Sequence, residues 1–253
     1  MTGVQADPAV DDRVLDELGY YLLAGAGGEG PATLMDEARR GEELGFGTAF
    51  ISERFNVKEA SSLVGAACAV TSRMHIATAA TNHNTRHPLI TGSWATTMHR
   101  LSGGRFTLGL GPSHHWIISD QLGLSYDRPA KQVRDYLDVL TASVTAPGPV
   151  QVSNDGFTVN ASIDVADAPS MPILLAALGN TMLRIAGERA DGTILWMADE
   201  RTIADHVVPR ITAAAGSTGR PAPRIVAGVP VALCGADETD RARAYASEVL
   251  GHA

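Results

Sequence analysis

The sequence is poor in lysine and has no basic cluster that could mark a nucleic-acid-binding face. Lys58 and Lys131 are its only lysines, and acidic residues outnumber basic ones to give a formal net charge of −8. A protein that neutralises nucleic-acid phosphates presents a basic surface. Nucleic acid is therefore not an expected partner.

The sequence also lacks a cysteine pattern, a long apolar run and a signal peptide. Cys68 and Cys234 are the only cysteines, far apart and without the spacing of a metal site, so we expect two buried thiols and no metal. No apolar run reaches the roughly 18 residues of a membrane span. The acidic stretch 1–17 has no apolar signal core, and we expect it to be flexible in a soluble, cytoplasmic protein.

Strand and helix patterns alternate along the rest of the chain, and hydrophobic residues, at 45%, suffice for a sizeable core. One segment, 147–161, breaks the alternation and predicts a hairpin that turns at Asn154-Asp155-Gly156. The predicted strands are 18–24, 48–52, 75–81, 105–110, 172–177, 192–197 and 224–233. The predicted helices are 31–44, 60–71, 88–101, 129–141, 181–189, 203–215 and 237–250, the last with Asp237 as its N-cap.

Strands that alternate with helices form a parallel sheet covered by helices. Seven such units fall one short of the eight that close a TIM-type barrel. We therefore predict the α/β class: a (β/α)8 TIM-type barrel formed as one domain by residues 18–253. A hairpin is inserted after its fourth unit, and the last βα unit is missing from this chain.

The loop Gly25–Gly30 matches the GxGxxG fingerprint of dinucleotide folds, and Glu53 follows the second strand, where such folds place a ribose-binding acid. In that fingerprint the third glycine packs inside the helix. Here Pro31 follows Gly30 directly, which favours a flexible glycine-rich loop over a nucleotide site.

Polar and glycine-rich motifs follow three later strands, and in a barrel these strand ends form the active site. Helix N-termini, such as the one after the fifth strand, also favour phosphate. Capping is the alternative role for Asn180 and for the Arg86-His87 pair, and Trp196 fits either a pocket wall or the core. The turn 102–106 lies at the opposite end of its strand, where a structural role is favoured. The strand-end residues are Thr81 and Asn82; Gly111, Pro112, Ser113, His114 and His115; and Leu178, Gly179, Asn180 and Thr181.

Taken in order, these motifs resemble the luciferase-like monooxygenase family, specifically its coenzyme F420-dependent branch. The resemblance rests on the segments 81–82, 85–88 (TRHP), 101–111 (LSGGRFTLGLG), 172–179 (PILLAALG) and 185–192 (IAGERADG). It implies a barrel with an insertion, usually a homodimer, and a deazaflavin or flavin that lies across the strand ends.

The resemblance also implies roles for individual residues. A non-prolyl cis peptide at Ala79–Ala80 would back the ring system. The cofactor phosphate would lie near 178–181, and the segment 111–113 would line the ring or its side chain. Glu53 stands where some members carry Asp before a catalytic His, and His114 stands where some carry Glu.

We therefore predict an enzyme that transfers a hydride between coenzyme F420 and a small organic substrate. The protein supplies one acid or base, for which Glu53 and His114 are the candidates. Two alternatives remain open, an FMN-dependent monooxygenase of the same family and a non-catalytic or truncated cofactor-binding homologue.

Overall fold

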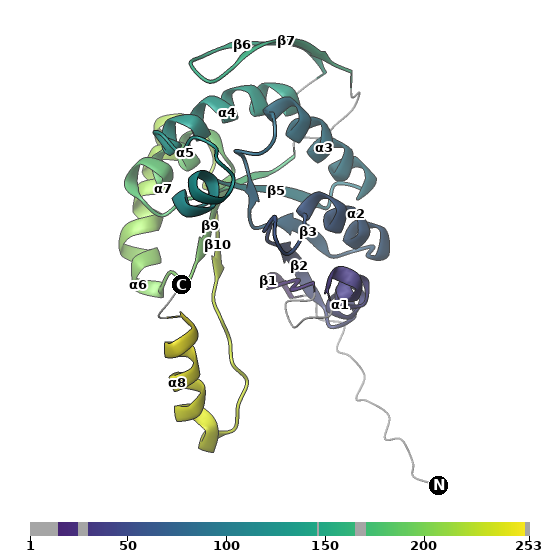
Figure 1. The fold of residues 1–253 in the computed structure, drawn as a ribbon, viewed down its shortest axis with the longest axis vertical. Helices are drawn as coiled ribbons and strands as arrows, with labels where there is room; N and C mark the ends of the chain where they lie inside the picture. The colour runs from purple at the N-terminus through teal and green to yellow at the C-terminus, as the bar shows by residue number, and fades with distance from the viewer. Residues whose placement is uncertain (1–14, 25–29, 146, 165–170, 251–253) are drawn as a thin grey trace.

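The computed structural model describes residues 15–24, 30–145, 147–164 and 171–250, so the loop 25–29 of the glycine fingerprint lies outside the described residues. A curled parallel sheet forms the centre, with helices on its outside (Figure 1). The sheet confirms the predicted α/β barrel class, and among the described residues no pairing joins β1 to β10. Its strands, in spatial order, are β1 (Leu15–Tyr21), β2 (Phe46–Ile51), β3 (His75–Thr78), β5 (Phe106–Gly111), β8 (Ile173–Ala176), β9 (Gly192–Trp196) and β10 (Arg224–Gly228), and β4 (Thr81–Asn82) also pairs with β5.

Helices connect successive strands, at the places where the apolar periodicity predicts them. Within the described part of the chain, no helix has both the length and the apolar character needed to cross a bilayer. The α-helices are α1 (Leu34–Glu43), α2 (Ala60–Val70), α3 (Pro88–Leu101), α4 (Pro129–Thr145), α5 (Asn180–Arg189), α6 (Glu200–Thr202), α7 (Val208–Ser217) and α8 (Thr239–Leu250). Short 3-10 turns are η1 (Gly30–Thr33) and η4 (Ala236–Glu238), and π-helical turns are η2 (Trp116–Gln121) and η3 (Ile203–Val207).

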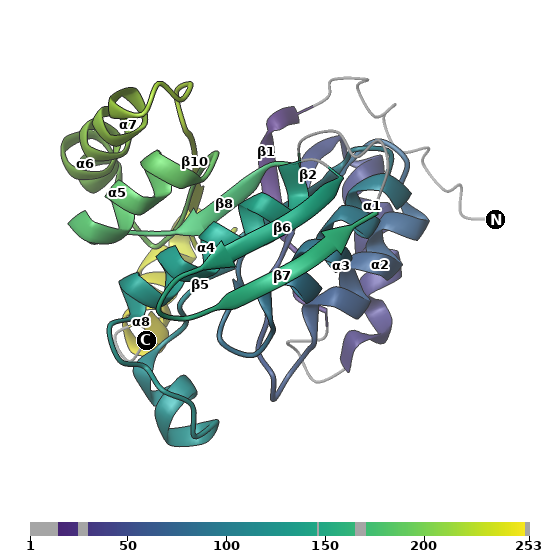
Figure 2. The same cartoon turned by 90° about the horizontal axis from the view of Figure 1, so that it is seen from above.

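The predicted hairpin is present after the fourth unit and consists of β6 (Gly148–Ser153) and β7 (Thr158–Ile163). Asn154 closes its turn by accepting hydrogen bonds from the backbone N–H groups of Gly156 and Phe157, at 3.0 and 2.8 Å. The hairpin lies across the outside of α4 (Figure 2), where Val150 and Val159 pack on Val139. Its apolar face is thus covered by a helix of the barrel.

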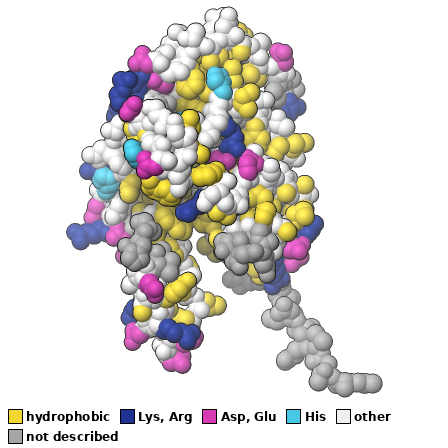
Figure 3. Space-filling model, in the orientation of Figure 1, with side chains coloured by type: hydrophobic (Ala, Val, Ile, Leu, Met, Phe, Trp, Pro, Cys, Tyr) yellow, Lys and Arg dark blue, Asp and Glu magenta, His cyan; other side chains and the backbone are white. Residues whose placement is uncertain are grey.

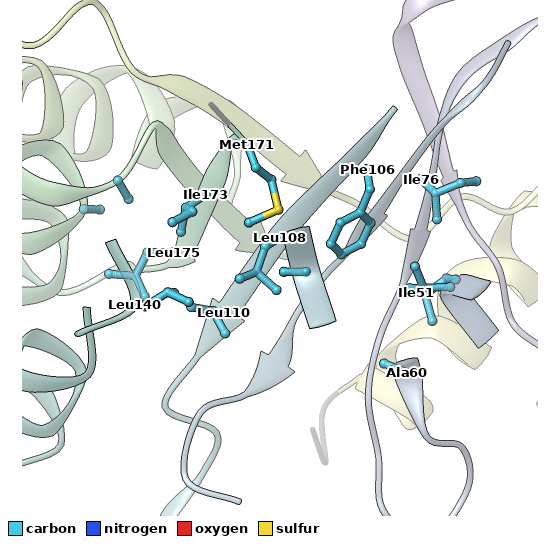
Figure 4. Close-up of a cluster of buried hydrophobic side chains, with 14 of the residues drawn as sticks. Ile51, Ala60, Ile76, Phe106, Leu108, Leu110, Leu140, Met171, Ile173 and Leu175 are labelled. Carbon is cyan, nitrogen blue, oxygen red and sulfur yellow. The ribbon is translucent and has the colours of Figure 1, made fainter. Parts of the chain in front are cut away.

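Two apolar layers lie on opposite faces of the sheet, because side chains alternate along a strand. The outer layer packs between sheet and helices and includes Ile76, Leu108 and Leu175 (Figure 4). The inner layer fills the concave side and is a smaller cluster. It consists of Phe50, Ala77, Ala79, Leu174 and Ile194, with Tyr21 and Val226 packed against it.

The first strand begins and ends three residues earlier than predicted, at Leu15 and Tyr21. Its ladder with β2 forms where the two backbones approach closely: a Cβ on Gly47 would lie 2.3 Å from the Asp16 carbonyl oxygen. Leu22 is buried without extending the strand. The prediction from the hydrophobic pattern is therefore wrong about the bounds of this strand by three residues.

The seventh strand is shorter than predicted, since β10 ends at Gly228 and not at Leu233. Pro230 has no N–H for a ladder, and the Leu233 side chain is fully exposed. Cys234 is therefore exposed, which corrects the expected pair of buried thiols, whereas Cys68 is buried and its burial raises the pKa of the thiol to about 11. The last helix has Gly235, not Asp237, as the N-cap of its leading turn.

The turn before β5 is structural, as the sequence favours. Arg105 donates hydrogen bonds to the carbonyl oxygens of Cys68, Thr71 and Met74 at 3.2, 2.9 and 2.8 Å. Its Nε also donates to the Ser102 carbonyl at 2.8 Å. One guanidinium thus satisfies carbonyl groups at the end of α2 and in the segment before β3, at the amino end of the strands.

Replacing Arg105 with Ala is expected to lower the free energy of unfolding by at least about 2 kcal/mol, because several carbonyl groups lose their donor. Cofactor affinity should not change, since Arg105 lies at the end of the barrel opposite the strand-end motifs. Urea unfolding measures the first effect, with the exposed Arg39→Ala of α1 as the control. A variant as stable as the wild type would contradict this role.

Candidate cofactor site at the carboxyl ends of the strands

The inner face of the barrel ends in small side chains at the carboxyl ends of neighbouring strands. A Cβ on Gly109 would lie 2.6 Å from the Ile194 Cδ1, so Gly109 faces the interior, as does Gly111 two residues later. Leu174 belongs to the inner layer, so Ala176 also faces inward. A Cβ on Gly111 would lie 3.2 Å from that of Ala176, which places these two strand ends side by side.

The third strand is broken at the same level by a cis peptide bond between Ala79 and Ala80, which confirms the bond that the family resemblance implied. Ala79 is part of the inner layer. The Ala80 Cβ would lie 3.5 Å from a Cβ on Gly111. Ala80, Gly111 and Ala176 thus form a surface of small residues across three strand ends, which we call the strand-end shelf.

Two aromatic side chains meet at the carboxyl ends of β1 and β9, at the same end of the barrel as the shelf. The rings of Tyr21 and Trp196 meet edge to face, with centroids 5.5 Å apart. A Cβ on Gly228 would lie 3.0 Å from the Trp196 ring and 3.1 Å from the Tyr21 ring. Trp196 is about half exposed (52%), so it belongs to the wall of the opening and not to the core.

Glu53 holds the segment that follows the cis peptide. Its backbone N–H donates to the Ala80 carbonyl at 3.4 Å, and its carboxylate accepts the Asn82 N–H at 3.0 Å. Thr81, between these two contacts, is buried, and its Oγ1 has no hydrogen-bond partner among the described residues. The predicted residues Glu53, Ala80, Thr81 and Asn82 are therefore brought together in one unit.

Arg86 neutralises Glu53. Its guanidinium nitrogens lie 3.0 and 2.9 Å from the two carboxylate oxygens, and the Glu53 side chain is only 9% exposed. The same guanidinium pairs with Glu59, the N-cap of α2. Burial acts to raise the pKa of Glu59, but hydrogen bonds from Ser61 and Ser62 outweigh it and hold this pKa at about 2.

The stability that Glu59 provides should therefore depend on pH. A carboxyl whose pKa is depressed in the folded state stabilises the fold above its ordinary value of 4.5, and loses that contribution as pH falls toward 2. At pH 6 we expect Glu59→Gln to cost about 1 kcal/mol of unfolding free energy. The difference from wild type should shrink between pH 5 and pH 3 in urea titrations, and a constant difference would contradict it.

The N-terminus of α5 is open to solvent and lacks a side-chain cap. Gly179 is its N-cap residue, which corrects the alternative role of Asn180 as the cap. Leu178, Gly179, Asn180 and Thr181 are all exposed, and nothing lies within 4 Å of a Cβ on Gly179. The first-turn N–H groups of a helix have no internal acceptor, so this end can receive an anion.

The loop after β5 turns sharply at Ser113. Ser113 has φ of 61°, in the left-handed region, and its carbonyl accepts a hydrogen bond from the Tyr126 hydroxyl at 2.8 Å. Pro112 is half-buried, whereas His114 is exposed and lies parallel to the Trp116 ring at 6.3 Å. His114 therefore lies on the loop and outside the unit that Glu53 and Arg86 form.

Sequence reasoning missed two contacts at this end of the barrel. Arg86 pairs with Glu53 instead of capping a helix, whereas His87 does cap α3 by accepting the Leu89 N–H. Lys58 donates to the carbonyl of Leu22, at the end of β1, at 3.2 Å. In the sequence, the contact was indicated only by the fact that Lys58 is one of just two lysines. Among the described residues, no group of three His, Cys, Asp or Glu side chains could hold a metal.

Comparisons with known proteins agree with this geometry. Residues 17–253 match the luciferase-like monooxygenase family. The chain is 31% identical to a 5,10-methylenetetrahydromethanopterin reductase of Methanopyrus kandleri, over 71% of this chain and 55% of the relative. It thus spans about half the length of the curated relatives it matches.

Two solved structures share the fold. One is the coenzyme F420-dependent tetrahydromethanopterin reductase from Methanopyrus kandleri, with a TM-score of 0.71, 24% identity, and coverage of 83% of this chain and 64% of that one. The other is the oxygenating constituent of 3,6-diketocamphane monooxygenase from Pseudomonas putida in complex with FMN, with a TM-score of 0.75, 18% identity, and coverage of 92% and 73%. At these identities the two structures show the common fold alone.

Proposed function

Because the chain belongs to the luciferase-like monooxygenase family, we propose that it is an oxidoreductase that binds coenzyme F420 and transfers a hydride between it and a small organic substrate. The observation that carries this proposal is the strand-end shelf of Ala80, Gly111 and Ala176, which lies at the same end of the barrel as the rings of Tyr21 and Trp196. Small side chains and aromatic rings at one end of a barrel suit a flat ring system.

The residues around the shelf fit the rest of the cofactor. The uncapped N-terminus of α5 offers free N–H groups at Gly179, Asn180 and Thr181 for a phosphate. Thr81, whose buried Oγ1 has no hydrogen-bond partner among the described residues, lies next to the cis peptide. Neighbours of these residues in the sequence complete the proposed set of cofactor contacts. They are Leu178 before Gly179, Pro112 and Ser113 after Gly111, and Ala79 and Asn82 on either side of Ala80 and Thr81.

The protein's own residues would position the reaction and move one proton. When bound, F420 supplies a ring carbon that accepts or donates the hydride. Glu53 is already paired with Arg86 through both carboxylate oxygens, so we assign it a positioning role. His114 is exposed on the loop beside the shelf, and an imidazole can exchange a proton near neutral pH.

These two assignments predict opposite behaviour in a matched pair of variants. Glu53→Gln should lower both cofactor affinity and stability, because the half-buried Arg86 then loses one of its two carboxylate partners. His114→Gln should change neither, because His114 is exposed and, among the described residues, its ring lies against Trp116 of the same loop. Titration of the cofactor and urea unfolding measure the two effects. Loss of cofactor affinity in His114→Gln would contradict this and would indicate that His114 contacts the cofactor.

An FMN-dependent monooxygenase is the second candidate, because the chain shares its fold with an FMN-bound monooxygenase and FMN also combines a flat ring with a phosphate. Anaerobic titrations with F420 and with FMN distinguish the two. We expect F420 to bind with saturable spectral changes, and binding of FMN alone would overturn the F420 assignment. Binding of neither would favour a non-catalytic homologue.

We also propose that the protein acts as a homodimer in the cytoplasm, as the family resemblance implies. Light scattering coupled to size exclusion tests the dimer, which should show twice the mass of the single chain. A monomer at micromolar concentration would contradict it.

A further inference from the structure

A hollow of about 620 Å³ lies near the proposed cofactor site. It opens between the loop from β4 to α3, the segment that leads into α4, and the turn of the β6–β7 hairpin. This volume lies within the range of small-molecule sites, roughly 300–1,000 Å³. His83 lines the hollow, and its N–H donates to the Gly111 carbonyl at 3.3 Å, which places the hollow next to the strand-end shelf. We call it the α4 cleft.

Most charged groups of the α4 cleft neutralise one another. Lys131 pairs with the buried Asp135 and, at 2.9 Å, with Asp155 on the hairpin turn. Arg86 pairs with the two carboxylates already described. Two charged residues of the lining, Asp127 and Arg128, make no ion pair within the described residues. Arg128 also acts on Asp155 electrostatically and helps to lower the pKa of that carboxyl, so the cleft offers one positive and one negative group that are not held in a direct ion pair among the described residues.

Arg128 is suited to hold a carboxylate. It has φ of 51°, in the left-handed region, and stands directly before Pro129, the first residue of α4. The N-terminal end of a helix adds its own attraction for an anion. The Asp127 carboxylate accepts a hydrogen bond from the Ser125 hydroxyl at 3.1 Å and can still accept one from a cation.

Asn84 adds an acceptor that has no donor. Its Nδ2 donates to the Gln132 Oε1 at 3.4 Å, but its buried Oδ1 has no hydrogen-bond partner among the described residues. This oxygen is closed to solvent, so a molecule in the cleft does not reach it. The cleft also has an apolar wall, where Phe157 meets the rings of His87 and Tyr136 at 5.5 and 6.0 Å.

We propose that the α4 cleft binds a small dipolar molecule of the α-amino acid class. Arg128 and the start of α4 hold its carboxylate, Asp127 accepts its ammonium group, and an apolar side chain packs on Phe157. This site is additional to the proposed cofactor site and needs no cofactor to form.

Isothermal titration calorimetry without cofactor tests the proposal with three probes that share a phenyl ring. L-Phenylalanine carries both charges, phenylacetate carries the carboxylate alone, and 2-phenylethylamine carries the ammonium group alone. We expect L-phenylalanine to bind with a Kd below about 1 mM and at least tenfold more tightly than either other probe. No binding of L-phenylalanine, or equal binding of phenylacetate, would overturn the proposal.

Three variants locate the bound molecule. Arg128→Gln and Asp127→Asn should each weaken L-phenylalanine binding at least tenfold, whereas Arg201→Gln on the exposed surface of α6 should leave it unchanged. Binding that survives in both cleft variants would place the probe elsewhere and overturn the assignment. Because no cofactor is present, the outcome is independent of the F420 titration.

Discussion

Replacing Arg86 with Met is expected to lower the free energy of unfolding by about 3–5 kcal/mol, because it leaves a buried carboxylate without its partner. The Glu53 side chain is only 9% exposed, and Arg86 is the cation that contacts both of its oxygens. Glu59 would lose the same partner. Urea unfolding at pH 7 measures the loss.

Two further variants separate charge pairing from simple loss of packing. Arg86→Met combined with Glu53→Gln should regain most of the stability, because the neutral amide still accepts the Asn82 N–H and no longer needs a cation. Arg39→Met, which breaks an exposed pair with Asp36, should change stability by less than about 0.5 kcal/mol. A double variant as unstable as Arg86→Met would show that the charge of Glu53 is not the cause.

Replacing Gly179 with Asp is expected to weaken cofactor binding by about 10³-fold and leave the protein as stable as the wild type, or more so. The new carboxylate would repel a phosphate and occupy the first-turn N–H groups of α5, which are worth roughly 1.5–3 kcal/mol each to a charged acceptor. For the helix itself, Asp is a favourable cap. Gly179 has φ of −75° and ψ of 154°, with nothing within 4 Å of a Cβ, so the side chain fits.

The matched control is Gly179→Asn, which caps the helix with nearly the same shape but no charge. It should weaken cofactor binding much less than Gly179→Asp does. Thermal unfolding and cofactor titration of both variants provide the comparison. If both variants lose the same cofactor affinity, the shape of the side chain and not its charge causes the loss. If Gly179→Asp binds the cofactor as tightly as the wild type, the phosphate does not bind at this helix.

The barrel could be predicted from the sequence because its signals are local. Alternating apolar runs and their Gly and Pro boundaries mark each unit, and Asn154 with Gly156 marks the hairpin turn. The errors lie where distant backbone decides the outcome. The first strand is set by the approach of Gly47 to Asp16, and the last strand stops before Pro230.

The candidate site could be predicted only in part, for the same physical reason. Glycines and polar residues at strand ends indicated the shelf and the start of α5, and the family resemblance supplied the cis peptide. The pairing of Arg86 with Glu53 joins residues 33 positions apart, and no local pattern reports it. The α4 cleft likewise gathers a loop, a helix start and a hairpin turn that only the folded chain brings together.

Amide hydrogen exchange tests most directly whether the cofactor binds at the strand ends. The exchange is measured with and without whichever of F420 or FMN binds in titration. We expect slower exchange in the segments 79–82, 111–113 and 178–183, with the N–H groups of Asn180 and Thr181 among the protected sites. Protection confined to the α4 cleft, at 83–87 and 124–132, or no protection at the start of α5, would contradict it.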